Sequence, residues 1–332
     1  MNKTKKYTTW VLCTVVTLLT ACTGSNTPKQ PTEEYTPVAP TFQSDSAYAF
    51  VERQCAFGPR VTGSEAHEQC GTWLSAEFTR MGASVTEQRA TFTLYDGKKV
   101  NGMNIIAAYN PDATDRLIIC AHWDSRPWAD HDPDEARHHT PIDGANDGAS
   151  GVAVLLELAR LMQQTPPQIG VDLICFDAED CGTPEWVEDE GSHEHTWCLG
   201  SQYWAEHHHV EGYTANCAIL LDMVGGSNTH FRRELFSLRY APQLTDRIWS
   251  MAHKLGCGQY FSYDEGGYVT DDHLPINRSG IPCVDVIGSD QTGGGFAQTW
   301  HTTEDNMRHI DRHILTAVGR TMAELIYTAT PL

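Results

Sequence analysis

The sequence predicts an α/β protein, a three-layer α/β sandwich with a mixed, mostly parallel central sheet. Short apolar runs typical of buried strands alternate along the chain with longer segments of helical periodicity, which is the pattern of that fold class. Several of the apolar runs end in charged residues, as strands of an open α/β sheet do where they border a ligand crevice. No repeat and no second linker interrupts the pattern, so residues 42–332 are expected to form a single domain.

The expected elements follow from these two periodicities. Strands are expected at residues 84–94, 103–109, 117–121, 171–176, 217–223 and 281–287. Helices are expected from residue 44 onward and at residues 65–81, 151–164, 201–209, 242–255 and 312–327. Residues 183–197, rich in acidic side chains, and the glycine-rich residues 289–299 resemble insertions at the rim of a pocket, because both follow predicted strands.

The N-terminus has the layout of an exported lipoprotein. Three lysines within the first six residues precede an apolar stretch over residues 10–19, which ends in Leu19-Thr20-Ala21-Cys22. The apolar run is shorter than the roughly 20 residues that a membrane-spanning helix needs. We therefore expect residues 1–21 to be a signal peptide, Cys22 to carry lipid and residues 22–41 to include a flexible tether. The expected location is the periplasmic face of the cell envelope, with the lipid as the membrane contact.

Charge and cysteine content narrow the partners. The formal net charge is −20, and removal of the first 21 residues leaves 20 basic and 43 acidic residues, a balance that repels nucleic acid and anionic lipid. We expect a monomer without a nucleic-acid partner. Cys13 leaves with the signal peptide and Cys22 takes lipid, so nine of the 11 cysteines remain as possible thiols, and their spacing is not that of a zinc finger. Cys181 and Cys198 bracket a loop and are the best candidates for a disulfide.

Ligand-type side chains follow several of the predicted strands and loops. They are His122, Asp124, Asp147, Glu179, Asp180, Asp222, Asp271 and His301. If five of these carboxylates meet in one crevice, they repel each other and lose hydration, which is costly unless a cation or retained protons compensate. The five are Asp147, Glu179, Asp180, Asp222 and Asp271. Carboxylate and imidazole donors without thiolate favour zinc, with manganese and cobalt as alternatives. The sequence therefore predicts a metal site whose open coordination position polarises a carbonyl.

The same residues carry a family resemblance over nearly the whole domain. His122-x-Asp124, the turn at residues 144–151 around Asp147, Glu179-Asp180, Leu221-Asp222 and His301 resemble the M28 zinc aminopeptidase superfamily. Within it, Thr270-Asp271-Asp272-His273-Leu274-Pro275, Trp300-His301-Thr302-x-x-Asp305-Asn306 and His122-Trp123-Asp124-Ser125-Arg126 are similar to the animal-type (type II) glutaminyl cyclases. The chain looks like a bacterial lipoprotein variant of that branch.

The resemblance implies a role for each position. Asp147, Asp180 and His301 would hold a single zinc ion, with Glu179 as the proton shuttle. Asp222 and Asp271 would form a hydrogen-bonded acidic pair beside the substrate. Trp300, Trp186 and Thr270 would bind the substrate, and His122, Asp124 and Asp285 would support the site from behind. Two positions depart from the animal enzymes: Asp180 replaces a glutamate, which shortens its reach, and Asp285 replaces a histidine.

Three functions remain open from the sequence. A glutaminyl cyclase would convert the N-terminal glutamine of peptides and proteins to pyroglutamate with release of ammonia, through a zinc-polarised γ-amide and Glu179. An M28 aminopeptidase would activate water between two zinc ions, for which the ligands are sufficient in number. A lipoprotein that binds peptides without chemistry is the third. Trp300 favours the cyclase, because an indole before His301 narrows the site where a peptide backbone would have to lie.

Overall fold

The computed structural model describes residues 35–188, 193–292 and 295–329. Within these ranges the strands are β1 (Ser84–Thr93), β2 (Lys99–Tyr109), β3 (Arg116–His122), β4 (Gly170–Phe176), β5 (Cys217–Asp222), β6 (His230–Arg233), β7 (Phe261–Glu265) and β8 (Cys283–Ser289). The helices are α1 (Ser44–Cys55), α2 (Glu65–Arg80), α3 (Ala149–Gln164), α4 (Leu199–Glu206), α5 (Leu235–Tyr240), α6 (Pro242–Lys254), α7 (His273–Arg278) and α8 (Arg312–Tyr327). The predicted signal peptide, Cys22 and most of the predicted tether lie outside the described residues.

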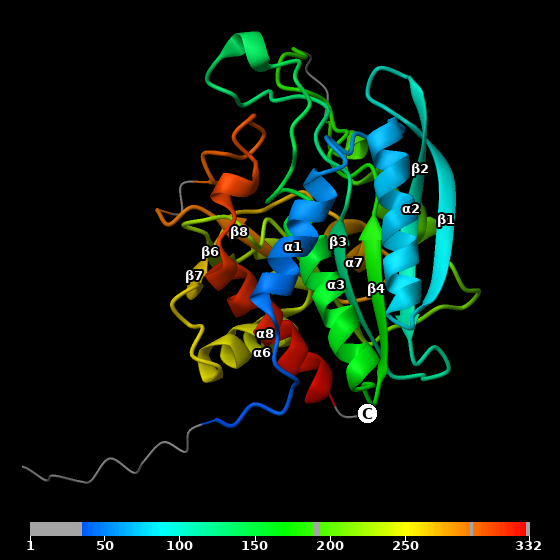
Figure 1. The fold of residues 1–332 in the computed structure, drawn as a ribbon, viewed down its shortest axis with the longest axis vertical. Coiled ribbons are helices and arrows are strands. Elements are labelled where there is room, and N and C mark those ends of the chain that lie inside the picture. Colours follow the sequence, from blue (N-terminus) through cyan, green and yellow to red (C-terminus); the bar gives the residue numbers. More distant parts are fainter. Residues whose placement is uncertain (1–34, 189–192, 293–294, 330–332) are drawn as a thin grey trace, which may run out of the picture. The chain divides into compact units, whose positions relative to one another are not determined.

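The strands form one sheet in the order β1-β2-β4-β3-β5-β8-β6-β7, with helices on both faces (Figure 1). β4, β3, β5 and β8 are parallel at the centre, whereas β1, β2 and β4 are joined by antiparallel pairings. α1, α3 and α8 pack together on one face. On the other face, Trp204 of α4 and Ile276 of α7 pack against Ile118 and Phe176 of the sheet. These features confirm the predicted three-layer α/β sandwich with a mixed sheet.

The register of the parallel strands brings polar residues to one edge of the sheet. Cys120 of β3 pairs with Leu220 of β5, so His122 and Asp222 end neighbouring strands. Residues 177–180 leave β4 on the other side of β3. β3 and β4 are buried along their whole length, as expected of strands that are covered on both faces. We call this the carboxyl edge of the sheet.

The start of α3 depends on one glycine. Gly148 precedes the helix with a φ of +94°, and an added Cβ would lie 2.5 Å from the carbonyl oxygen of Asp124. A glycine at this position lets the chain pass close to the end of β3 and places Asp147 at the carboxyl edge. A larger side chain would push the two segments apart.

The segment before α1 is fixed to α8. The carboxylate of Glu324 accepts hydrogen bonds from the N–H groups of Val38 and Ala39, at 2.9 and 3.1 Å. Phe42 packs against Gly319, where an added Cβ would come within 2.2 Å of the phenyl ring. A buried carboxylate and a close aromatic contact therefore tie the beginning of the domain to its last helix.

Some sequence predictions about the fold were incomplete or wrong. The short elements β6, β7, α5 and α7 were not predicted, because four to six residues are too few to show a periodicity. The predicted disulfide is absent: Cys181 and Cys198 are free thiols. Their sulfur atoms face different partners, Thr62 Oγ1 at 3.4 Å for Cys181 and Glu179 Oε1 at 3.3 Å for Cys198.

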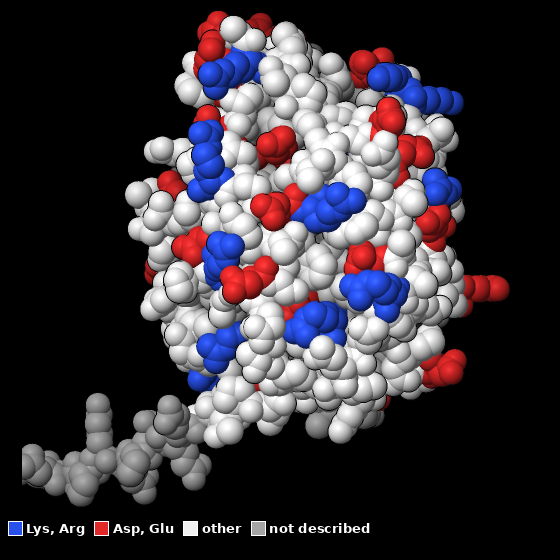
Figure 2. All heavy atoms as spheres, in the orientation of Figure 1, with Lys and Arg blue, Asp and Glu red and all other residues white. Residues whose placement is uncertain are grey.

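The surface charge and the character of the helices can be compared with the expected absence of a nucleic-acid partner and of a membrane span. On the face seen in Figure 2, lysine and arginine side chains lie among acidic ones rather than in a continuous basic area. In the part of the chain that the structure describes, no helix has both the length and the apolar character needed to cross a membrane.

Candidate active site

Seven buried acidic and histidine side chains meet at the carboxyl edge. They are His122 at the end of β3, Glu179 and Asp180 after β4, Asp222 at the end of β5, Asp147 before α3, Asp271 before α7 and His301 between β8 and α8. The most exposed of them, Glu179, is only 8% exposed. The sequence had predicted this convergence, and the structure brings all seven together.

Asp147, Asp180 and His301 form the first donor group. Nε2 of His301 lies 3.1 Å from Oδ1 of Asp180 and 3.6 Å from Oδ2 of Asp147. Oδ2 of Asp147 and both carboxylate oxygens of Asp180 are buried without a hydrogen-bond partner among the described residues. Ligand atoms bound to tetrahedral zinc through oxygen and nitrogen lie about 3.4 Å from one another. The spacing and the unpartnered oxygens therefore fit a zinc ion.

Two residues that were not predicted support this group. Oδ1 of Asp130 lies 3.5 Å from Nδ1 of His301. Arg126 donates to Oδ1 of Asp130 at 2.9 Å and to the backbone carbonyl of Asp180 at 3.1 Å. Burial raises the pKa of Asp130, but the hydrogen bonds with Arg126 and His301 outweigh it and hold that pKa well below its usual range. A carboxylate in this position fixes the ring orientation and the tautomer of a metal-binding histidine.

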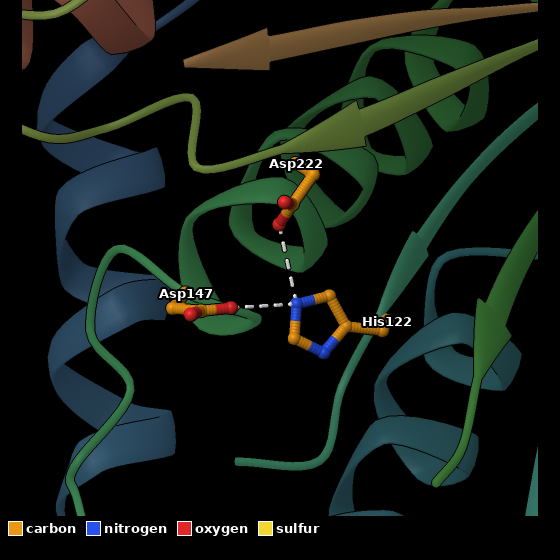
Figure 3. Close-up of side chains that lie close together, drawn as sticks. All are labelled: His122, Asp147 and Asp222. Carbon is orange, nitrogen blue, oxygen red and sulfur yellow. Dashed lines mark hydrogen bonds and ion pairs between the residues drawn. The ribbon is translucent and has the colours of Figure 1, made fainter. Parts of the chain in front are cut away.

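His122, Asp147 and Asp222 form the second donor group (Figure 3). Nε2 of His122 lies 3.0 Å from Oδ1 of Asp147 and 3.2 Å from Oδ1 of Asp222. Burial lowers the pKa of His122. The hydrogen bonds of the imidazole with Asp124, Asp147 and Asp222 outweigh this effect, so that the pKa lies well above its usual value. His122 was expected to lie behind the site, but it contacts Asp147 directly. The second donor group could either share a proton or hold a second metal ion.

Glu179 precedes Asp180 in the turn that follows β4. The carboxylate of Asp124 accepts the backbone N–H groups of Glu179 and Asp180 at 3.1 and 3.2 Å, which fixes the turn that carries both acids. Burial raises the pKa of Glu179 well above its usual value, and the charges of Asp271 and Asp180 add to this effect while His122 opposes it. A carboxylate with a raised pKa can accept and release a proton near neutral pH.

Asp271 and Asp222 do not form a hydrogen bond in the described part of the chain. Oδ1 of Asp271 accepts the N–H of Asp272 at 2.6 Å, and Oδ2 has no hydrogen-bond partner among the residues that the structure describes. Burial and the charge of Asp222 raise the pKa of Asp271 well above its usual value, so the predicted pair requires a proton held between them. Asp285 is fully buried behind Asp271, with Oδ2 at 3.8 Å from Nδ1 of His273.

Unusual backbone conformations are concentrated at this edge. Of the non-glycine residues with positive φ in the described ranges, four lie beside the acidic and histidine side chains: Ala178, Cys198, Met223 and His301, with φ from +50° to +58°. Such conformations cost free energy and persist where the surrounding structure enforces them, which is common at functional sites. The tertiary structure therefore enforces unfavourable backbone conformations at this site.

A cavity of about 340 Å³ opens over the donor groups. Trp300 and Thr270 line it, as predicted, together with Trp197 and Phe296. The indole of Trp300 is stacked on the imidazole of His301, with ring centroids 3.8 Å apart and planes inclined by 24°. Aromatic side chains therefore wall the space directly above a candidate metal ligand.

The prediction that Trp186 forms the second wall is wrong. Trp186 is 38% exposed and is not among the residues that line the cavity. It packs instead against Trp128 and His139, at centroid distances of 5.9 and 4.5 Å. Trp197, later in the same insertion, lines the cavity and lies parallel to the ring of His301 at 6.0 Å. Trp197 therefore takes the place in the wall that the resemblance assigned to Trp186.

Comparison with known proteins places this fold and site in one family. Residues 104–326 match the sequence profile of peptidase family M28. The chain belongs to peptidase family M28. This M28 chain is 28% identical over 257 residues to aminopeptidase YwaD of Bacillus subtilis and 27% identical over 244 residues to the glutaminyl-peptide cyclotransferase of Bos taurus. The matches cover 75% and 63% of this chain, and span 49% and 61% of the length of those relatives.

Solved structures match this M28 chain more completely. It superposes on the glutaminyl cyclase of Bacteroides thetaiotaomicron with a TM-score of 0.86 and 50% identity, over 88% of this chain and 100% of that chain. It superposes on a zinc-dependent exopeptidase of Parabacteroides distasonis with a TM-score of 0.85 and 50% identity, over the same two shares. The predicted family resemblance is confirmed, and both reactions considered from the sequence are represented among the similar proteins.

Proposed function

We propose that this protein is a zinc-dependent glutaminyl-peptide cyclotransferase, which converts the N-terminal glutamine of peptides and proteins to pyroglutamate and releases ammonia. The stacking of Trp300 on His301 is the main support for this proposal. An indole in this position would narrow the space for a peptide backbone and favour the entry of one flat amide side chain. The 50% identity to the glutaminyl cyclase of Bacteroides thetaiotaomicron, over the whole of that chain, supports the same reaction.

A single zinc ion would be held by Asp147, Asp180 and His301. Bound there, zinc would supply a Lewis acid that polarises the γ-carbonyl of the substrate glutamine. Burial and the charge of Asp147 raise the pKa of Asp180 to about 6, so these carboxylates repel each other unless a cation lies between them. The similarity to a zinc-dependent exopeptidase supports zinc as that cation.

Glu179 would move the proton. Its carboxylate accepts a proton from the α-amine of the substrate as the amine nitrogen attacks the γ-carbon of the same glutamine. When the bond from the γ-carbon to the amide nitrogen breaks, Glu179 returns the proton to that nitrogen, which leaves as ammonia. No proton is gained or lost overall. Asp271 also lines the cavity, and it would hold the α-amine by a hydrogen bond.

The aromatic walls would orient the substrate. The side chain of glutamine must fold so that its γ-carbon meets its own α-amine, and confinement lowers the entropic cost of this conformation. Trp300 and Trp197 both line the cavity, and their indoles would exclude water that competes with the amine. Thr270 lines the same cavity and offers a hydroxyl to the substrate backbone.

An M28 aminopeptidase is the second candidate function. The observation in its favour is the second donor group, in which His122, Asp147 and Asp222 share a contact through Nε2 of His122. With both donor groups loaded, two metal ions would flank Asp147, and Glu179 would activate water instead of an amine. The similarity to aminopeptidase YwaD supports this alternative.

One experiment separates the two functions. The purified, zinc-loaded protein is incubated with two peptides that differ only in an N-terminal glutamine or leucine, and ammonia, free amino acids and zinc per chain are measured. The cyclase proposal expects ammonia from the glutamine peptide, no free amino acid from either peptide and close to one zinc ion. Free leucine at a comparable rate, with two tightly held ions, would establish the aminopeptidase. If neither ammonia nor a free amino acid is formed, the protein would be a peptide-binding protein without catalytic activity.

We also propose that the protein is exported and attached to the cell envelope through lipid on Cys22, with the domain as a monomer on the periplasmic face. The support is the sequence of the first 22 residues, which lie outside the described part of the chain.

A further inference from the structure

Glu179, Cys198 and Asp271 form a third donor group, and the proposed reaction does not use it as a unit. One ligand atom from each residue lies within 4.8 Å of the other two. Oδ2 of Asp271 is buried and has no hydrogen-bond partner among the described residues, and the whole side chain is only 3% exposed. Glu179 and Asp271 line the cavity, so an ion that enters the cavity can reach the group.

The backbone holds Cys198 against Glu179. The N–H of Cys198 donates to the carbonyl oxygen of Glu179 at 3.0 Å, and the N–H of Leu199 donates to that of Ala178 at 3.1 Å. Cys198 has a φ of +58°, a conformation that persists because these bonds enforce it. As a result, Sγ of Cys198 lies 3.3 Å from Oε1 of Glu179, with the thiol as donor. The sulfur atom is thus positioned at the proposed proton shuttle.

We propose that Glu179, Cys198 and Asp271 form an inhibitory site for a thiophilic divalent cation such as cadmium or excess zinc. Bonds from zinc of about 2.3 Å to sulfur and about 2.1 Å to oxygen place the two ligand atoms about 3.6 Å apart in a tetrahedral site, close to the contact between Cys198 and Glu179. The sulfur distinguishes this group from the other two at the carboxyl edge, whose donors are oxygen and nitrogen.

Binding would require the thiol to lose its proton. Burial and the charge of Glu179 raise the pKa of Cys198 well above its usual value, so the free protein carries the thiol and not the thiolate. When the cation binds, a metal–sulfur bond forms, the S–H bond breaks and the proton passes to solvent. The cation also offsets the mutual repulsion of the buried carboxylates around it.

Occupation of this group would stop turnover without removing the catalytic zinc. The carboxylate of Glu179 would be engaged by the second cation and could no longer accept a proton, while Asp147, Asp180 and His301 would be untouched. The inhibitory effect rests on the proposed role of Glu179, which the cyclase and the aminopeptidase share. Binding of the cation to Cys198 rests on the geometry alone.

The test is a titration of the zinc-loaded protein with cadmium chloride, with magnesium chloride as a hard cation that should have no effect. We expect one cadmium ion per chain in addition to zinc, an ultraviolet thiolate-to-cadmium charge-transfer band, and loss of activity over the same concentration range. Cys198→Ser keeps a hydroxyl donor beside Glu179 but lacks the soft sulfur. It should lose the band and need at least about tenfold more cadmium for half-inhibition of its own activity.

Cys181→Ser is the matched control. Cys181 is another buried thiol close to Glu179 in sequence, but its sulfur faces Thr62 and Asp124 and it belongs to none of the donor groups. This variant should show the same band and the same relative inhibition as the parent protein. If Cys198→Ser does not fold, which circular dichroism would reveal, Cys198→Ala serves in its place with the same expectation.

Three results would overturn the proposal. Cadmium could replace the zinc without a further ion being bound, or the band and the inhibition could persist in the Cys198 variants. Inhibition that is lost in His122→Asn and kept in Cys198→Ser would assign the cation to the second donor group. The metal count and the absorbance do not depend on cyclase activity, so failure of this site and failure of the proposed function are distinguishable.

Discussion

Oδ1 of Asp130 lies 3.5 Å from Nδ1 of His301, while Nε2 of the same ring lies 3.1 Å from Asp180. Asp130 thus faces the nitrogen that does not point into the first donor group. Asp130→Asn keeps the volume of the side chain and removes its charge, so it should weaken zinc binding about tenfold or more. Competition with a chelator measures this. Asp134→Asn, at an exposed nearby acid, should change nothing; equal loss in both variants would mean that Asp130 does not act through His301.

Glu179→Gln should abolish turnover and leave zinc bound, because it removes a proton acceptor without removing a proposed ligand. We expect a loss of at least about a hundredfold in kcat. Asp147→Ala and His301→Ala should lose the metal as well. Metal analysis and ammonia release, measured on the same preparations, check both expectations. Release of zinc by Glu179→Gln would show that the roles assigned to Glu179 and Asp180 are reversed.

Trp300→Ala should reduce kcat/KM for a peptide with N-terminal glutamine by roughly a hundredfold, because the side chain loses the wall that restricts its rotation. Zinc content should stay constant, since the donor group is unchanged. Trp186→Ala is the control: that indole lies on Trp128 and outside the cavity, so its loss should have little effect on turnover. The opposite order of effects would restore Trp186 as the wall.

Glu234 belongs to a buried network of hydrogen bonds and charged groups that includes His273. Its carboxylate lies 3.3 Å from Nε2 of His273 and accepts the N–H groups of Phe236 and Ser237. Burial raises the pKa of Glu234, but the bonds with His273 and with the backbone outweigh it and lower that pKa below the usual 4.5. Because the folded-state pKa is the lower one, the stabilisation is present above pH 4.5 and is lost as the pH falls through the folded-state pKa.

Glu234→Gln should therefore lower the free energy of unfolding by about 1–3 kcal/mol at neutral pH. The difference from the parent protein should shrink as the pH falls below 4.5. Urea denaturation at several pH values, at a fixed zinc concentration, measures it. A difference that does not vary with pH would indicate lost packing and not lost ionisation.

Cys22→Ser should block lipid attachment and yield an unprocessed or a soluble exported protein. Mass spectrometry of the mature N-terminus, together with fractionation of membranes, checks this. A parent protein whose mature N-terminus is unmodified and lies downstream of Cys22 would contradict the proposed anchor and leave a secreted enzyme.

The central strands and their polar ends could be predicted because their signals are local. β3 and β4 are mostly apolar and buried along their whole length; β3 ends in His122, and the turn that carries Glu179 and Asp180 follows β4. A parallel sheet then brings such ends together without further information. Asp147 and His301 could be placed through the family resemblance, because each lies in a short motif of fixed spacing.

The parts that could not be predicted depend on how loops fold back. Both Trp186 and Trp197 are tryptophans in the same insertion. Only the path of the chain through that insertion decides which indole reaches the cavity. Asp130 follows the motif that includes Arg126, but nothing in its sequence context indicates a contact with His301. The position of Cys198 at the end of a loop suggested a disulfide with Cys181. Its positive φ and its contact with Glu179 depend on the tertiary structure and could not be predicted.

The attachment of the N-terminal segment to α8 has a mechanical consequence. Val38 and Ala39 are bound to Glu324 near the end of α8, on the side of the domain away from the carboxyl edge (Figure 1). A pulling force on the N-terminus would therefore enter the domain through these hydrogen bonds and the contact of Phe42 with Gly319. The force would therefore act first on α8 and not on the loops that carry His301 and Glu179.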